Sequence, residues 1–316
     1  MRPGRSFTVV SAVLAALAVC AVATSRPIIG ILAQDLYSCA ICGMRNQTYI
    51  AASYVKFVEQ AGARVAPIFV DRDRSYYVNM FNSLNGVLLP GGDVDALDSS
   101  YGRAGSILTE LAMEAHKNGT HFPIWGTCLG LELLARLAVG GQQVLKKCAA
   151  QGVGMPLEFA KDFRQSHLYH SLPEDLEKVL SSKPVTYNAH YWCLTLQNFT
   201  TFGLDNLFRL TSTNVDANGV TFISSMEAYS YPFYGVQFHP EKNNFEWTQR
   251  KDHIHIPHTE DAVRVSQYLG NFFLDEARKN NHSFASAQEE LDALIYNYPA
   301  TFTQKETALA QMYIFN

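Results

Sequence analysis

The sequence predicts an α/β protein, a three-layer α/β/α sandwich around a mostly parallel sheet. Short apolar runs bounded by Gly or Pro alternate with segments of helical periodicity, and continuous apolar runs are typical of strands buried on both faces of a parallel sheet. Distinctive polar motifs directly follow several of these runs, where ligands bind in such sheets. A chain of 316 residues, 47% of them hydrophobic, is long enough to bury a core of this kind.

The first half of the chain shows the alternation most clearly. The segment from Thr48 has apolar residues at Tyr49, Ala52, Val55 and Val58, and it closes on a helix-ending glycine. Pro-Gly-Gly abruptly ends the apolar run at 86–89. We expect strands at 27–33, 64–69, 86–89 and 122–125, and helices at 48–62, 107–118 and 131–139.

The second half has shorter apolar runs, and its element boundaries are harder to assign. A long amphipathic helix is expected at 259–278, where it would cover one face of the sheet. Because no stretch is rich in Gly, Pro and Ser, we expect residues 26–316 to form a single domain. The strands expected in this half are 184–186, 208–213, 220–226 and 234–238.

Residues 1–25 are typical of a secretory signal peptide. Arg2 and Arg5 precede an apolar run over 7–23, and the small residues 21–23 lie at cleavage spacing. The run is short for a membrane anchor, so we expect a secreted chain with no membrane span after cleavage. Four Asn-x-Ser/Thr sequons agree with a luminal compartment and predict glycosylated surface positions at Asn46, Asn118, Asn198 and Asn281.

Several classes of partner are not expected. The net charge of −4, with no dense run of Lys or Arg, argues against a nucleic-acid partner. Cys39 and Cys42 have the spacing of a redox or zinc pair, but no second pair accompanies them. His253, His255 and His258 are interpreted as a polar loop, so no metal is expected.

The strongest chemical signal is Gly126-Thr-Cys128-Leu-Gly130, which lies between an expected strand and an expected helix. Glycines two positions before and after a reactive residue are typical of a nucleophile elbow, a strained turn that presents the side chain above the sheet. The positive end of the following helix is expected to lower the pKa of the thiol and so favour the nucleophilic thiolate. The alternative is an inert buried cysteine.

A second motif, His239-Pro-Glu241, ends the expected strand at 234–238. His239 would act as a base toward Cys128, and Glu241 would orient the imidazole through its other nitrogen. The backbone N–H groups of Gly91, Gly92 and Leu129 would stabilise an oxyanion. Taken alone, His239 could be a surface histidine and Pro-Gly-Gly a simple turn.

These motifs, in this order, resemble those of class I glutamine amidotransferases, and the resemblance covers most of the chain after the signal peptide. Within that superfamily the sequence is similar to the γ-glutamyl hydrolase family, on the stretches Ile50-Ala-Ala-Ser-Tyr-Val-Lys56, Ala61-Gly-Ala-Arg-Val65, Trp125-Gly-Thr-Cys-Leu-Gly130, Ser225-Met-Glu227 and Ala277-Arg-Lys-Asn-Asn-His282.

The resemblance implies a flavodoxin-like fold and a homodimeric, secreted and lysosomal enzyme that needs no cofactor. Its substrates would be folyl and antifolyl poly-γ-glutamates, and an acidic pH optimum is expected. The resemblance also assigns Cys128 as nucleophile, His239 as general base and acid and Glu241 as the orienting carboxylate, with Tyr54 and His190 as substrate-site residues. Tyr54 also fits a helix core, and His190 also fits a hydrogen-bonded structural histidine.

Two other functions are compatible with the motifs. A glutaminase shares the same acyl-transfer chemistry, but it would release ammonia from glutamine and leave γ-glutamyl peptides intact. A catalytically silent secreted glycoprotein that binds folates or a receptor would not need Cys128, His239 and Glu241 together.

Overall fold

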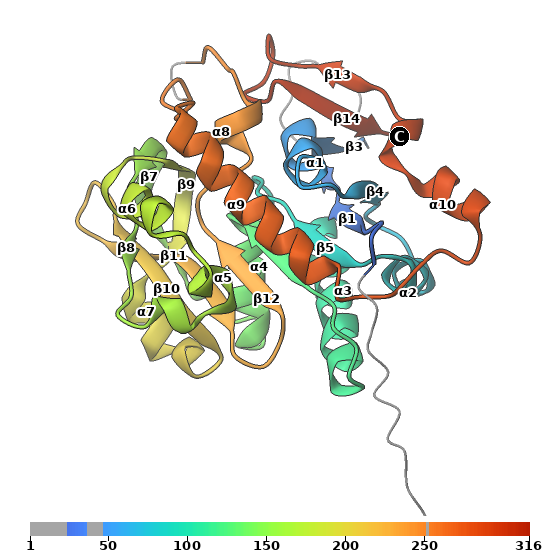
Figure 1. The fold of residues 1–316 in the computed structure, drawn as a ribbon, viewed down its shortest axis with the longest axis horizontal. Helices are drawn as coiled ribbons and strands as arrows, with labels where there is room; N and C mark the ends of the chain where they lie inside the picture. Colours follow the sequence, from blue (N-terminus) through green and yellow to red (C-terminus); the bar gives the residue numbers. More distant parts are fainter. Residues whose placement is uncertain (1–23, 37–46, 251–252) are drawn as a thin grey trace, which may run out of the picture.

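The fold is built on an eight-stranded sheet, which a computed structural model describes for residues 24–36, 47–250 and 253–316 (Figure 1). Five strands pair in parallel at one end, and three antiparallel strands extend the other end. The sheet runs β4 (Arg64–Ile68), β1 (Ile28–Leu32), β5 (Gly86–Leu89), β6 (Ile124–Thr127), β12 (Phe233–Val236), β11 (Thr221–Ala228), β10 (Phe208–Val215), β8 (Glu158–Phe159).

The order β4-β1-β5-β6 is the 2-1-3-4 order of flavodoxin-like sheets, which confirms the expected fold class. The central strands are buried on both faces. In β1, Ile28 and Leu32 pack into one apolar cluster, whereas Ile29 and Ile31 pack into another on the opposite face. This alternation is what a sheet between two helical layers requires.

One helical layer contains α1 (Ala52–Glu59), α8 (Lys242–Phe245) and α9 (Glu260–Ala277), and in Figure 1 α9 crosses the parallel strands. The other layer contains α2 (Arg74–Ser83), α3 (Ser100–Lys117) and α4 (Leu129–Ala138). The remaining helices are α5 (His167–His170), α6 (Glu174–Ser182), α7 (Leu196–Thr201) and α10 (Ala287–Ala293), with short 3-10 turns at Phe163–Gln165, Leu204–Asn206 and Ile295–Asn297.

The helix expected from residue 48 begins four residues later, at Ala52, because Thr48–Ala51 form strand β3 of a second sheet. The helix expected at 107–118 begins earlier, at Ser100, where the Ser99 hydroxyl accepts a hydrogen bond from Gly102 N–H and caps it. The other helices and strands expected from the sequence form within a few residues of the expected bounds, except that the short run at 184–186 is only the start of a longer strand, β9.

Two smaller antiparallel sheets were not expected. The first runs β13 (Ala300–Phe302), β14 (Gln311–Phe315), β3, β2 (Gln34–Asp35), so it joins segments far apart in sequence. The second pairs β7 (Leu145–Met155) with β9 (Thr186–Leu194). The apolar pattern of β7 is weak because it contains two lysines, a glutamine and glycines, and the ladder is interrupted by bulges.

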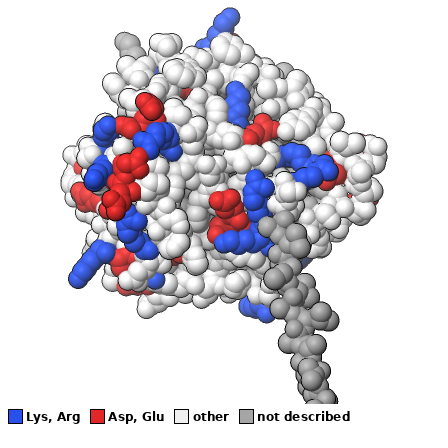
Figure 2. All heavy atoms as spheres, viewed as in Figure 1, with Lys and Arg blue, Asp and Glu red and all other residues white. Residues whose placement is uncertain are grey.

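Charged residues of both signs are interspersed on the face of the molecule shown in Figure 2. Ion pairs between Lys183 and Asp261 and between Arg264 and Asp175 join the α6 segment to α9. Among the residues that the structure describes, no helix is both long enough and apolar enough to span a membrane.

The start of α4 lies directly against β5 and β6, and two glycines permit this contact. A Cβ on Gly130 would lie 2.2 Å from the carbonyl oxygen of Leu89, and a Cβ on Gly126 would lie 2.6 Å from the carbonyl carbon of Gly130. The backbone of the elbow is therefore fixed in place by contacts that only glycine allows.

We expect Gly130→Ala to lower the free energy of unfolding by about 2 kcal/mol, because the added methyl group collides with backbone that cannot move independently. Urea unfolding followed by tryptophan fluorescence measures this. Gly119→Ala is the comparison variant, since its Cβ meets nothing within 4 Å and only its φ of +83° opposes the substitution, at a cost of about 1 kcal/mol. Equal costs for the two variants would contradict the packing argument.

Candidate active site

The carboxyl ends of three neighbouring parallel strands, β5, β6 and β12, bring the sequence motifs together. A Cβ built on Gly91 would lie 2.6 Å from His239 Cε1, 2.8 Å from the Tyr54 hydroxyl and 3.1 Å from Cys128 Cβ. Four residues predicted for the site from the sequence therefore surround one point. The absence of a side chain at Gly91 is what allows this convergence.

Cys128 has the geometry of a nucleophile elbow. Its φ of 50° and ψ of −105° are unusual for a residue with a side chain, and such strain is typical of functional sites. The backbone is held by a hydrogen bond from Cys128 N–H to the carbonyl of Val236, at 2.8 Å, and by one from Glu132 N–H to the carbonyl of Cys128, at 3.0 Å. Strand β12 and helix α4 thus enforce the turn from both sides.

The environment of the thiol opposes its ionisation. Burial raises the pKa of Cys128 well above its usual value, and the Glu132 carboxylate raises it further. The N–H of Leu129 and the charge of Lys242 lower it, but not enough to compensate. The expectation that the helix N-terminus would lower the net pKa is therefore wrong, and a base must remove the proton.

His239 is placed to be that base. Its Nδ1 lies 2.8 Å from Glu241 Oε1, and its backbone N–H donates to the carbonyl of Tyr187 in β9 at 2.8 Å. Burial lowers the pKa of His239, and Glu241 opposes this shift. The imidazole is therefore neutral, and since Nδ1–H donates to the carboxylate, Nε2 is left as the proton acceptor.

Tyr54 and Gly91 are joined by a hydrogen bond that affects the predicted oxyanion site. The Tyr54 hydroxyl accepts a bond of 2.8 Å from Gly91 N–H and lies 3.3 Å from His239 Nδ1. Gly91 N–H is thus already occupied, contrary to the role expected for it. Within the described chain, no group accepts a hydrogen bond from Gly92 N–H, and Leu129 N–H is directed to the Cys128 thiol.

His190 is buried in β9, close enough to His239 for their charges to interact. Its Nδ1 lies 2.9 Å from the carbonyl of Trp192 and its Nε2 lies 3.1 Å from Asn188 Oδ1. Burial lowers the pKa of His190 to about 3, so the ring is neutral. Because both partners are acceptors and the neutral ring has one N–H, only one of these two contacts is a hydrogen bond donated by His190.

Three residues at the site were not predicted from the sequence. Gln34 Nε2 donates to the carbonyl of Gly91 at 2.7 Å, while its Oε1 is buried without a partner. Gln237 Nε2 lies 3.6 Å from Cys128 Sγ and 3.1 Å from Glu132 Oε1. Gln237 lies two residues before His239 and Glu132 four residues after Cys128, so their positions in the motifs were a usable signal.

The sequons differ in accessibility. Asn118 and Asn281 are exposed, as expected. The surface position expected for Asn198 is wrong: it is 7% exposed, and its Nδ2 donates to the carbonyl of Val144 at 2.7 Å. Asn46 lies outside the described residues.

The cysteines of the described residues are free thiols: Cys128, Cys148 and Cys193 are all buried. Cys39, Cys42 and the proposed signal peptide up to residue 23 lie outside the described residues. In the described part of the chain, no group of three or more His, Cys, Asp or Glu side chains is arranged to hold a metal ion.

Comparison with known proteins agrees with this geometry. The model of the peptidase C26 family matches residues 27–241. The γ-glutamyl hydrolase of Rattus norvegicus is 44% identical over 93% of this chain and 90% of its own, and that of Homo sapiens is 42% identical over 92% and 90%. γ-Glutamyl hydrolase 1 of Arabidopsis thaliana is 34% identical over 88% of this chain and 79% of its own.

We expect Gly91→Ala to slow the reaction of Cys128 with iodoacetamide at neutral pH by about tenfold or more, because the methyl group displaces the imidazole that takes the thiol proton. Mass spectrometry of the Cys128 peptide measures the rate. Gly92→Ala should have a smaller effect, since the nearest atoms to its Cβ are at the far end of the Gln34 side chain and do not belong to Cys128 or His239. An unchanged rate in Gly91→Ala would show that this contact does not position the base.

Proposed function

The chain belongs to the peptidase C26 family and to the γ-glutamyl hydrolases within it, and on this premise we propose that it removes γ-linked glutamate from folyl and antifolyl polyglutamates. The observation that carries the proposal is the convergence of Cys128, His239 and Tyr54 around Gly91. The acidic partner Glu241 completes a nucleophile, a base and a group that orients the base.

Acylation begins with transfer of the Cys128 proton to His239 Nε2. The thiolate attacks the γ-carbonyl carbon of a glutamyl residue, so a C–S bond forms and the carbonyl electrons move onto oxygen. The oxyanion accepts a hydrogen bond from Gly92 N–H, and one from Leu129 N–H, which the sulfur releases as it bonds to carbon. As the tetrahedral intermediate collapses, the C–N bond breaks, and the protonated His239 gives its proton to the departing α-amine.

Deacylation reverses the direction of proton flow. His239, neutral again, takes a proton from water, and the hydroxide attacks the thioester carbonyl. The C–S bond breaks, the free γ-carboxyl group leaves, and the thiolate recovers its proton from His239. Glu241 keeps the imidazole in the same tautomer during both steps, because its Oε1 accepts from Nδ1 throughout.

The occupied N–H of Gly91 gives Tyr54 a role in this scheme. The Tyr54 hydroxyl holds the Gly91 backbone by accepting its N–H, which orients the peptide toward Gly92. Release of that bond when substrate binds would add Gly91 N–H to the oxyanion donors. Tyr54 thus acts on the oxyanion loop, and His190 supports the base through the β9 backbone that accepts His239 N–H.

The setting of the enzyme follows from its sequence. The pattern over residues 1–25 supports secretion and lysosomal delivery, and the exposed Asn118 and Asn281, together with Asn46, are the glycosylation sites that remain after Asn198 is excluded. Residues 26–316 act as one catalytic domain, and the enzyme functions as a homodimer without cofactor. These parts of the proposal rest on the sequence resemblance.

Hydrolysis of a pteroylpolyglutamate by the purified protein should release glutamate or γ-glutamyl peptides, and Cys128→Ala should reduce the rate by at least about 10³-fold because no nucleophile remains. Chromatography resolves the products by chain length, and free ammonia is assayed in parallel with glutamine as substrate. Ammonia release without peptide cleavage would identify a glutaminase instead. A rate unaffected by the substitution would contradict the assigned nucleophile.

A further inference from the structure

A buried carboxyl group lies on the side of Cys128 that the mechanism above does not use. Gln237 forms the link: its Nε2 lies 3.6 Å from Cys128 Sγ and 3.1 Å from Glu132 Oε1. Glu132 is in the first turn of α4 and is only 6% exposed, and Gln237 is fully buried. One side-chain amide therefore contacts both the nucleophile and an ionisable group.

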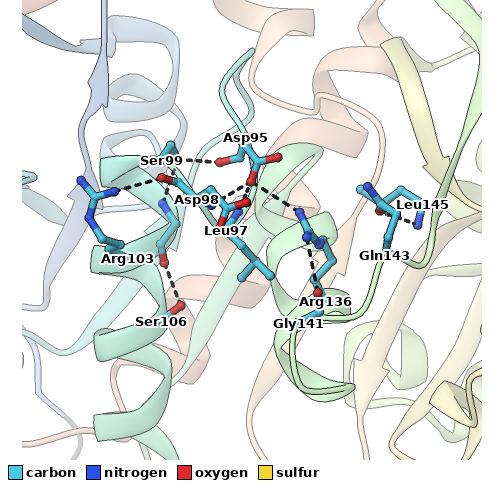
Figure 3. A network of polar contacts seen from close by, with 11 residues as sticks. Asp95, Leu97, Asp98, Ser99, Arg103, Ser106, Arg136, Gly141, Gln143 and Leu145 are labelled. Atoms are coloured by element: carbon cyan, nitrogen blue, oxygen red, sulfur yellow. Dashed lines mark hydrogen bonds and ion pairs between the residues drawn. The ribbon is translucent and has the colours of Figure 1, made fainter.

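Arg136, one helical turn after Glu132 in α4, lowers the pKa of Glu132 through its charge but makes its own polar contacts elsewhere. Figure 3 shows its side chain beside Asp95, in the loop before α3, and Gly141. Its guanidinium lies 3.5 Å from Asp95 Oδ1 and 3.4 Å from the carbonyl of Gly141. No ion pair joins Arg136 to Glu132 within the described residues.

The other titratable groups near Glu132 are uncharged. Tyr101 approaches from α3, and burial raises its pKa. Cys148 approaches from β7, and a hydrogen bond with Cys193, followed by burial, raises its pKa. On α4 itself the neighbours are Arg136 and Cys128. An ionised Glu132 would thus place an unpaired negative charge beside the reactive sulfur.

We infer that Glu132 and Gln237 are positioning residues that set the pH range in which Cys128 can become a thiolate. The inference rests on the proposed function only in taking Cys128 as the nucleophile. When Glu132 is neutral, the Gln237 amide donates to the sulfur and no charge opposes the thiolate. When Glu132 is ionised, its carboxylate disfavours a second negative charge at the same amide.

The direction of the pH dependence follows from where Glu132 titrates. Burial raises the pKa of Glu132 to about 7, and the Gln237 hydrogen bond and Arg136 limit that rise. Below this pH the carboxyl group is neutral and the thiolate is accessible through His239. Above it the carboxylate forms, so reactivity should fall on the alkaline side of neutral pH.

The test compares Glu132→Gln with the wild-type protein in two assays across pH, iodoacetamide alkylation of Cys128 and kcat/KM for a pteroylpolyglutamate. At pH 8, Glu132→Gln should be alkylated at least about tenfold faster, the effect of removing a like charge that raises the thiol pKa by a unit or more. At pH 5 the two proteins should react equally, because Glu132 is then uncharged in both. The alkaline decline of kcat/KM should move to higher pH in the variant.

Gln237→Met should change the alkylation rate of Cys128 in the opposite direction. It removes the N–H donor from the sulfur and keeps the carboxyl group, so alkylation should slow at pH 5, where Glu132 is uncharged in both proteins. Glu227→Gln is the matched control: Glu227 is also a buried carboxyl group with a raised pKa, but it accepts from His167 N–H and Leu168 N–H and does not contact Cys128. Its alkylation profile should follow the wild type, and thermal unfolding verifies that each variant is folded.

A Glu132→Gln effect of the same factor at pH 5 and pH 8 would overturn the inference, since altered packing changes the rate equally at both. The inference would also be overturned if kcat/KM of Glu132→Gln declined at the same alkaline pH as that of the wild type. Alkylation ratios as expected, without Cys128-dependent hydrolysis in the wild type, would support the inference and reject the proposed substrate instead.

Discussion

The close approach of backbone at three glycines is the constraint on which the rest of the site depends. Because Gly130 has no side chain, the start of α4 can contact the carbonyl of Leu89. Because Gly126 has none, strand β6 can contact the backbone of Gly130 at the start of α4. With the elbow fixed in this way, Gly91 can lie against Cys128 and His239. The catalytic groups are thus positioned by rigid strands and one helix end, with little dependence on mobile loops.

The same close packing has an electrostatic cost. It removes water from the thiol and the imidazole, and burial favours the neutral form of each. In the resting site Cys128 is therefore a thiol and His239 is neutral. Opposite charges form on the two residues only when the proton of Cys128 moves to His239. Glu241 opposes the effect of burial on the side of the base, and the N–H of Leu129 and the charge of Lys242 oppose it in part on the side of the sulfur.

The fold class and the proximity of Cys128 and His239 were predictable because their signals are local. Cys128 lies in a strand-turn-helix segment, and the glycines two positions before and after it indicate a tight turn. His239 follows the end of an apolar run that indicates a strand. Strand β3 was assigned to a helix, because its partner β14 lies more than 200 residues away and periodicity in one segment cannot report that pairing. Gln34 was missed for the same reason: its contact with Gly91 spans 57 residues.

Errors at individual residues have equally specific causes. The sequon at Asn198 satisfies the local pattern, but Asn198 lies in the first turn of α7, and its amide caps a buried carbonyl. The pKa of Cys128 was expected to be lowered by the dipole of the following helix, because the sequence places Cys128 directly before that helix. The competing desolvation depends on how deeply the folded chain buries the thiol, and sequence spacing does not reveal this.

The four-stranded sheet β13-β14-β3-β2 ties the site to a segment far along the chain. Strand β14 pairs with β3, which leads directly into the helix that carries Tyr54, and Ala310 N–H donates to Glu246 at 2.6 Å. On this edge β3 is paired by residues 311–315, which lie far along the chain. The position of Tyr54 therefore depends on strand pairing between distant parts of the sequence, as well as on the packing of its own helix.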